Sequence, residues 1–407
     1  MKGEKKMMKT LTFLSAVAVS AAVQAVPTVD NVRVTQGDNK VVTVTYDLKD
    51  EPAVVLAAFT TNGAPVSGEA ALFCRGQVNR LVANGMNRSF TWKPRKLFPN
   101  QASASLAVKL TAFATNCPPT YLMVDLREQD RVIYFADEAS LPGGSVENSL
   151  FKKDAILFFK APARNATFRM GDAPGERSRG TRDVTHLVTF SDDFYIGVYE
   201  FTQGQYHHLT TKNFTPSGDD IPVNLVSYDQ MRGSTYTWPD DGHAVAEGEE
   251  SVLGRLRAKC GVEIDLPTDA QWEFACRAGT STIWNDGRAK PAEVTDVAWC
   301  EDNSNNSGPF SVGGKPANDW RLFDFHGNVW ETVLDWNKNQ LTANATDPTG
   351  PVAGESDQDG GKNVHVIRGG AYNKGWTFCR AGHRNNYNPA SADRAVGFRL
   401  ACPATAW

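Results

Sequence analysis

The alternation of apolar and polar residues in the first part of the chain most constrains its fold. Apolar residues alternate with polar ones from Val32 to Val34 and from Val42 to Leu48, and the turn signal Gly37-Asp38-Asn39 separates the two runs. A period of two places the apolar side chains on one face of a strand. Further runs of this kind, broken by Gly, Asn and Pro turns, predict an all-β sandwich domain over residues 26–125.

The character of the sequence changes after residue 125. Residues 126–150 are polar and contain Pro142-Gly143-Gly144, which predicts a linker. In residues 151–407 tryptophan becomes frequent, and loops rich in Gly, Asn and Asp replace most strands. Helices are predicted at Thr202–Thr210 and at Thr268–Ala278, the second with a capping-box pattern at its start. The sequence therefore predicts an α+β fold class, with much irregular structure in the second domain.

The amino terminus resembles an export signal. Four lysines in the first nine residues precede the short apolar run Leu11–Val19, and Val23-Gln24-Ala25 is a suitable cleavage site. This order predicts a secretory signal peptide over residues 1–25 and an exported protein, either periplasmic, on the cell surface or extracellular. The alternative is a membrane anchor, although the apolar run is short for a span. We expect no transmembrane segment in the mature chain.

Charge and motifs exclude several classes of function. The formal net charge of −4 does not favour a nucleic acid as partner. The sequence has no HExxH zinc motif, no GxSxG elbow, no P-loop and no GxGxxG fingerprint. A zinc protease, a serine hydrolase of that type and a nucleotide-binding enzyme are therefore not indicated.

The cysteine content permits disulfides in an exported protein. There are seven cysteines and no CxxC pair, so at least one thiol is unpaired within the chain. Cys74 and Cys117 lie in the predicted sandwich, and we expect a Cys74–Cys117 disulfide there. The alternative is a pair of buried, unlinked thiols.

Seven motifs in the second domain carry a resemblance to a known family. In chain order they are FRMGD (168–172), YIGVYEFTQGQY (195–206), IPVNLVSYDQ (221–230), LPTDAQWEFACRAGT (266–280), LFDFHGNVWE (322–331), VIRGGAY (366–372) and VGFRLA (396–401). This succession is similar to the formylglycine-generating-enzyme, or sulfatase-modifying-factor, domain family. The resemblance implies a variant of the C-type lectin fold, mostly irregular, with small twisted sheets and a few helices.

The resemblance also implies a structural calcium ion at LFDFHGNVWE. By position, Asp324 and Glu331 would bind it through their side chains, and Gly327 and Val329 through their backbone oxygens. Carboxylate and carbonyl oxygens are the ligands that calcium prefers. The alternative is a metal-free structural turn.

The copper site of the catalytic relatives is incomplete here. Those members hold copper(I) between two cysteines after a Gly-Gly-Ser-Tyr turn, which in this chain is Gly369–Tyr372 with Ala371 in the serine position. Lys374 stands where the first cysteine is expected, and counting five residues onward reaches Cys379. A linear two-thiolate site needs both cysteines, so copper is not expected. Cys379 would be the catalytic residue only if the chain were an oxidase.

Cys379 can also be aligned with a different cysteine of the family. Counted back from Arg384, Cys379 falls at a cysteine that the family uses in a disulfide. On this reading the resemblance implies the disulfides Cys276–Cys379 and Cys260–Cys402, and it leaves Cys300 as the odd thiol.

Aromatic and arginine side chains near the carboxyl terminus suggest a binding surface. Trp376, Arg380 and Tyr387 lie in a segment rich in Gly and Asn, and such side chains suit sugars, sulfates, carboxylates or peptides. For the neighbouring Arg384 and Arg399, the alternative is a structural role in buried ion pairs.

These observations lead to two main hypotheses. The first is an exported, calcium-stabilised binding or accessory module whose partner is a glycan, a sulfated polymer, or a protein or peptide. The second is a formylglycine-generating-type oxidase that acts on a cysteine of a sulfatase or another protein. A non-haem iron enzyme related to the same family is less favoured, because nothing before residue 150 resembles the required histidine-bearing helical domain.

Overall fold

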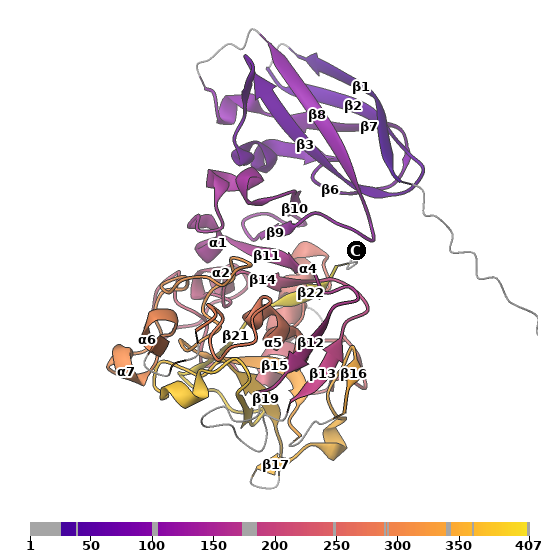
Figure 1. The fold of residues 1–407 in the computed structure, drawn as a ribbon. Coiled ribbons are helices and arrows are strands. Elements are labelled where there is room, and N and C mark those ends of the chain that lie inside the picture. The colour runs from indigo at the N-terminus through magenta and orange to yellow at the C-terminus, as the bar shows by residue number, and fades with distance from the viewer. Residues whose placement is uncertain are drawn as a thin grey trace, which may run out of the picture.

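The structure is a computed structural model, and it describes residues 26–37, 40–99, 105–172, 185–246, 250–288, 290, 293–338, 343–359 and 362–404. The predicted signal peptide, residues 1–25, lies outside the described residues. The chain forms two domains, an all-β domain at the top of Figure 1 and a larger mixed domain below it. Among the described residues, no helix combines the length and apolarity that crossing a bilayer requires.

The first domain is a sandwich of two four-stranded sheets, as the alternation predicts. One sheet has the order β1 (Thr28–Gln36), β2 (Val42–Lys49), β7 (Gly85–Trp92) and β5 (Cys74–Gly76). In the other, β3 (Ala53–Thr61) pairs with β4 (Ala64–Pro65), β6 (Arg80–Val82) and β8 (Leu106–Ala114). Short 3-10 helices are η1 (Gly68–Phe73) and η2 (Pro94–Lys96).

The sandwich core forms where the alternating side chains of both sheets meet. In β2 the residues Val42, Val44, Tyr46 and Leu48 are buried. Phe59 and Trp92, from opposite sheets, stack with their ring centroids 4.2 Å apart. The period-two pattern therefore identified the buried face of β2, whereas Val32 and Val34 of the other alternating run are exposed on β1.

The second domain is built on a five-stranded sheet. Its order is β10 (Val132–Phe135), β9 (Tyr121–Asp125), β11 (Ala155–Ala161), β14 (Phe194–Gly197) and β22 (Ala401–Pro403), with antiparallel neighbours. The predicted boundaries are wrong at this point: β9 belongs to this sheet and not to the sandwich, and the expected linker contains β10. All five residues of β9 are buried because the strand lies between β10 and β11.

Smaller sheets and short helices complete this domain. One sheet has the order β12 (Thr167–Met170), β13 (His186–Thr189) and β16 (Ala345–Thr346). Another has the order β20 (Arg384–Tyr387), β19 (His365–Arg368), β15 (Trp330–Trp336) and β21 (Val396–Phe398), and β17 (Gln358–Asp359) pairs with β18 (Lys362–Asn363). The helices are α1 (Leu150–Lys153), α2 (Gln203–His207), α3 (Tyr228–Arg232), α4 (Val252–Cys260), α5 (Asp269–Arg277), α6 (Val294–Val297), α7 (Glu301–Ser304), η3 (Glu138–Ser140), η4 (Pro142–Gly144), η7 (Ala353–Glu355) and η8 (Trp376–Phe378).

Both helices expected from the sequence are present, as α2 and α5. Thr268 is the N-cap of α5, and its side chain accepts a hydrogen bond from the backbone N–H of Gln271. The Gln271 side chain accepts in return from the Thr268 N–H, so the capping box is complete. The cap fixes the start of α5, where Asp269 enters the core of the domain beside β15 and β19.

Candidate functional site

The loop Phe323–Val329 leads into β15 and is buried throughout. Asp324 and Asn328 have left-handed backbone angles, with φ of 60° and 59°. Gly327 has φ +80°, and a Cβ there would lie 2.0 Å from the carbonyl oxygen of Trp299. Only glycine fits this position, because both the backbone angle and the close approach exclude a side chain. The loop therefore has a fixed backbone that presents its oxygens in a defined arrangement.

Asp324 carries a carboxylate oxygen without a partner. Its Oδ2 accepts a hydrogen bond from the backbone N–H of Gly313 at 2.5 Å. Its Oδ1 is buried and has no hydrogen-bond partner among the described residues. Burial raises the pKa of Asp324 to about 6, while the Gly313 N–H and the Arg399 guanidinium oppose that rise. A buried acceptor in this state is suited to a cation or a proton.

The carboxylate of Glu331 is already occupied. Arg399 donates from Nη2 to Oε1 at 2.7 Å and from Nε to Oε2 at 3.0 Å. Trp272 Nε1 donates to Oε2 at 2.6 Å. All three side chains are buried. Glu331 thus acts in the structure as the counter-ion of Arg399, as the structural alternative for this arginine predicted.

Glu200 is a third carboxylate in this region, and sequence reasoning did not identify it. It is fully buried, and it accepts hydrogen bonds from Asn328 Nδ2 at 2.6 Å and from the Val329 N–H at 3.2 Å. Burial raises its pKa well above the usual value, and the carboxylates of Asp324 and Glu331 raise it further. The one signal in the sequence was its place inside the motif YIGVYEFTQGQY.

The loop fits a calcium ion in part. Three acids, Glu200, Asp324 and Glu331, interact electrostatically with the guanidinium of Arg399, and Lys152 also lowers the pKa of Asp324. The free Oδ1 of Asp324 and backbone carbonyls, such as those expected of Gly327 and Val329, are hard oxygen ligands. In the described ranges, no three His, Cys, Asp or Glu side chains converge as metal ligands. A cation here would thus depend on Asp324 and backbone oxygens more than on Glu331.

The region of the expected copper cysteines is apolar. Cys379 is fully buried, and its pKa is raised well above the usual value by burial and then by the neighbouring Cys300. Cys300 and Cys379 pack in one apolar cluster with Trp284. The carbonyl of Lys374 accepts the backbone N–H of Glu301 at 3.0 Å, which holds α7 against this segment. The fold thus places Cys300 beside Cys379, a neighbourhood that the sequence did not predict.

All seven cysteines are free thiols in the structure, so none of the three expected disulfides is formed in it. Cys276 and Cys379 both lie near His326. The Sγ of Cys276 is 3.9 Å from Nε2 of His326, and Nδ1 of His326 is 2.7 Å from the backbone carbonyl of Cys379. Nε2 of His326 accepts the backbone N–H of Asn285, so Nδ1 carries the proton and donates to that carbonyl. Burial lowers the pKa of His326 to about 4, and the histidine is a neutral structural group.

The other two expected pairs differ from each other. Cys260 and Cys402 belong to one apolar cluster, and burial followed by the charge of Cys260 raises the pKa of Cys402. Cys74 is buried in the sandwich and contacts the carbonyl of Ala70, whereas Cys117 is exposed with its Sγ 4.0 Å from Lys160 Nζ. The different surroundings of Cys74 and Cys117 do not support a disulfide between them.

The expected ligand-binding residues do not form one surface. Arg380 is buried and pairs with Asp172, so it does not line an exposed cleft. Trp376 in η8 and Tyr387 in β20 are each half-buried, and they pack against different apolar clusters. Arg384 is also buried, with its Nε 2.7 Å from Asp269 Oδ2. The structural role expected as the alternative for Arg384 is therefore the one observed.

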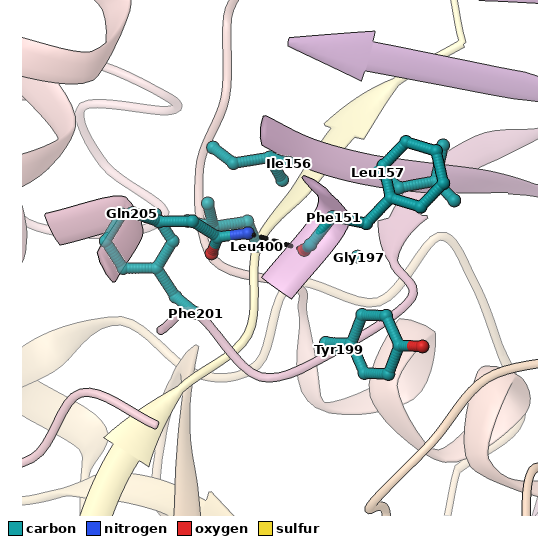
Figure 2. A pocket seen from close by; sticks show the side chains of 8 residues that line it. All are labelled: Phe151, Ile156, Leu157, Gly197, Tyr199, Phe201, Gln205 and Leu400. Atoms are coloured by element: carbon teal, nitrogen blue, oxygen red, sulfur yellow. Dashed lines mark hydrogen bonds between the residues drawn. The ribbon is translucent and has the colours of Figure 1, made fainter. Parts of the chain in front are cut away.

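A small cavity in the core of the second domain is no ligand site. It has a volume of about 10 Å³ and lies between α1, β11, the end of β14 and α2, next to Leu400 (Figure 2). The Gln205 side chain lines this cavity, and its Nε2 donates a hydrogen bond to the carbonyl of Phe151 at 2.9 Å. A volume of this size holds about one water molecule.

The comparisons with known proteins agree with the motifs. The family described as "Sulfatase-modifying factor enzyme 1-like domain" matches residues 136–404. The chain therefore belongs to the sulfatase-modifying-factor family. The matched region starts directly after β10, so it covers the second domain except for β9 and β10.

Individual relatives match over shorter regions. The formylglycine-generating enzyme of Mus musculus is 28% identical over 152 residues, which cover 33% of this chain and 38% of that protein. A protein of Chlamydia caviae, "Serine/threonine-protein kinase pkn1", is 31% identical over 140 residues, covering 33% of this chain and 20% of that protein. The chain thus matches less than half the length of either relative. The solved structure of Treponema denticola variable protein 1 aligns with a TM-score of 0.46 and 21% identity over 61% of this chain and 95% of that chain.

Proposed function

We propose that the protein is an exported, calcium-stabilised binding or accessory module that does not generate formylglycine. One observation supports this most strongly: at the two positions where the catalytic relatives are expected to hold copper, this chain has Lys374 and the fully buried thiol of Cys379. An ammonium side chain cannot act as a soft thiolate ligand. The relatives' activity therefore does not transfer to this chain with the family fold.

The surroundings of Cys379 support the same conclusion. A copper ligand must be a thiolate, and burial disfavours the charged form of a thiol. The pKa of Cys379 lies well above the usual value for this reason, and Cys300 beside it is also shifted upward by burial. No cationic group contributes to the pKa of Cys379, and the backbone hydrogen bond of Ala371, which lowers this pKa, does not offset the effect of burial.

The calcium part of the proposal rests on the loop geometry. Gly327 fixes the turn, and the buried Oδ1 of Asp324 lacks a partner among the described residues. A calcium ion would satisfy this oxygen and offset part of the negative charge of Glu200, Asp324 and Glu331. The ion would stabilise the loop and take no part in a reaction.

Export and a macromolecular partner complete the proposal. Export is supported by the signal-peptide pattern of residues 1–25, and amino-terminal sequencing of the secreted form should find a start near Val26. The partner is a glycan, a sulfated polymer, or a protein or peptide. Trp376 and Tyr387 remain the proposed contacts, because both side chains are partly exposed.

The direct test is a formylglycine assay. The purified mature chain is supplied with copper(I), oxygen and a peptide containing Cys-x-Pro-x-Arg, and the peptide is analysed by mass spectrometry. The Streptomyces coelicolor formylglycine-generating enzyme, a 31% identical relative, serves as the positive control. We expect no conversion by this chain. Conversion that is lost in Cys379→Ser would contradict the proposal.

An oxidase is the second candidate, and one observation favours it. Cys300 lies beside Cys379 and supplies a second sulfur that the sequence motif lacks. If this pair replaced the usual one, activity in the same assay would require Cys300 as well as Cys379. Conversion by the wild type that is abolished in Cys300→Ser would establish this reading.

A further inference from the structure

A large open pocket lies away from both the calcium loop and Cys379. Its volume is about 510 Å³, and it lies where the start of α5, β15, β13 and the segment from Ala343 to Glu355 meet. Pockets of roughly 300–1,000 Å³ are typical of sites for small ligands or single side chains of a partner. The structure thus contains a cavity of suitable size that the proposed function does not use.

Asp335 is the most buried acid that lines this pocket without a cationic partner. The residue is 2% exposed, and its Oδ2 accepts the backbone N–H of Asp269 at 2.7 Å. Its Oδ1 lies on the side of Gly350, which also lines the pocket. A Cβ at Gly350 would come within 2.8 Å of Oδ1, so a side chain there would cover the oxygen.

The other acids of the pocket are already compensated. Asp269 pairs with Arg368 and with Arg384, each at 2.7 Å. At the rim, Glu355 pairs with Lys338 at 3.1 Å. Asp335 forms no ion pair with any described residue, although Arg384 is close enough to affect its charge.

Exposed Asp347 is the remaining acid of the pocket, and its Oδ1 accepts the backbone N–H of Ser191 at 2.9 Å. His186 also lines the pocket. An unpaired carboxylate in such a setting favours a ligand that brings a positive charge and N–H donors.

The remaining wall is aliphatic. Met170, Ala270, Ala345, Pro348 and Pro351 contribute apolar surface to the same pocket. Such a wall contacts the methylene stem of a long cationic side chain while the charged end reaches a polar partner. Aromatic residues, which would favour a sugar ring or a quaternary ammonium group, are not among the described lining residues.

We propose that this pocket binds an alkylammonium group, with the Oδ1 of Asp335 as the acceptor and the aliphatic wall around the stem. The ammonium group has three N–H donors and a compact charge, which match one buried carboxylate oxygen. The group belongs to a lysine side chain of a partner protein or to a free diamine. This site goes beyond the proposed function, and neither its presence nor its absence affects the formylglycine assay.

The test compares probes that differ in charge. Binding to the full mature chain is measured by isothermal titration calorimetry at pH 9 for Nα-acetyl-lysine amide, for its norleucine analogue, and for 1,5-diaminopentane. At this pH the Asp335 carboxyl, whose pKa burial raises to about 8, is ionised, and the lysine ammonium is still charged. The lysine probe is expected to bind at least tenfold more tightly than the norleucine probe. Stronger binding of the lysine probe indicates a peptide-borne ligand, and stronger binding of the diamine indicates a free amine. Equal binding of the lysine and norleucine probes, or no binding of either amine at millimolar concentration, would overturn the proposal.

Two variants locate the site. Asp335→Asn keeps an oxygen that accepts the Asp269 N–H but removes the negative charge. It is expected to lower the affinity for the lysine probe at least tenfold, or about 1.4 kcal/mol. Asp30→Asn removes the same charge from the sandwich domain, where exposed Asp30 pairs with Lys49, and it should leave the affinity unchanged. Undiminished affinity in a folded Asp335→Asn variant would refute the role of this residue.

A second readout does not depend on the variant being folded. In the wild-type chain labelled at its methionine methyl groups, the NMR signal of Met170, assigned with Met170→Leu, should shift when the lysine probe binds. A probe that binds without moving this signal binds elsewhere, and that result would also overturn the proposal.

Discussion

The pH dependence of stability should carry a distinct contribution from Asp335. Burial, followed by the neighbouring carboxylate of Asp269, raises the pKa of Asp335 to about 8. In the unfolded chain an aspartate titrates near 3.9. Between these two pH values the folded state binds one more proton than the unfolded state. The contribution of Asp335 to the free energy of unfolding is therefore complete below the pKa of the unfolded chain. It is lost as the pH rises toward the pKa of the folded protein.

The magnitude follows from one proton. The free energy of unfolding should fall by up to about 1.4 kcal/mol per pH unit from this residue, or about 2.7 kcal/mol between pH 5 and pH 7. Asparagine does not titrate, so Asp335→Asn lacks this contribution. The quantity to measure is the difference in unfolding free energy between wild type and variant, because other titrating groups cancel in it.

The assay is urea denaturation at several pH values, followed by tryptophan fluorescence. Wild type should lose stability relative to Asp335→Asn as the pH rises from 5 to 7. Glu355→Gln, an exposed acid of the same region, provides the control and should show no such trend. A difference between wild type and Asp335→Asn that stays constant over this range would refute the burial argument for this carboxylate.

Three further predictions concern the loop and its surroundings. Gly327→Ala should destabilise the protein by roughly 3 kcal/mol or more in chemical denaturation, because its Cβ would meet the Trp299 carbonyl and its backbone angle disfavours a side chain; a loss below about 1 kcal/mol would show that the loop can relax. Arg399→Met should cost about 3–5 kcal/mol, because it leaves the Glu331 carboxylate buried without its counter-ion; near-wild-type stability would contradict that pairing. Removal of calcium with a chelator should lower the melting temperature of the wild type but not of Asp324→Asn; an equal drop in both proteins would place the ion elsewhere.

The sequence predicted those parts of the fold that depend on local patterns. The alternation in β2 identified the sandwich, and the capping box at Thr268 identified the start of α5. The strand β9 was assigned to the wrong domain because its five buried residues show no alternation. A strand that pairs on both sides depends on partners far along the chain, and local patterns carry little information about them.

The candidate site was predictable only where a motif carried it. Asp324 and Gly327 were found from one contiguous loop. Glu200 was missed because its contacts with Asn328 and Val329 join residues 128 and 129 positions apart. Arg380 was expected at the surface, but Asp172 pairs with it in the interior, and nothing in the sequence near Arg380 indicates this distant acid.

The proximity of Cys300 and Cys379 could not be predicted either. The two residues lie at the start of α7 and directly after η8, and neither sequence segment marks the other as its neighbour. Their contact follows from the way α7 packs against the segment that carries Lys374. This arrangement is a property of the folded domain and of no single motif.

The metal content of the purified mature protein distinguishes a calcium-stabilised binding module from a copper-dependent oxidase. The chain is expressed with export, offered calcium and copper(I), separated from free metal and analysed by elemental mass spectrometry. We expect about one calcium ion per chain, held by the Asp324 loop, and no tightly bound copper. Stoichiometric copper that is lost in Cys379→Ser would contradict this expectation, and an oxidase would then be the better description of this protein.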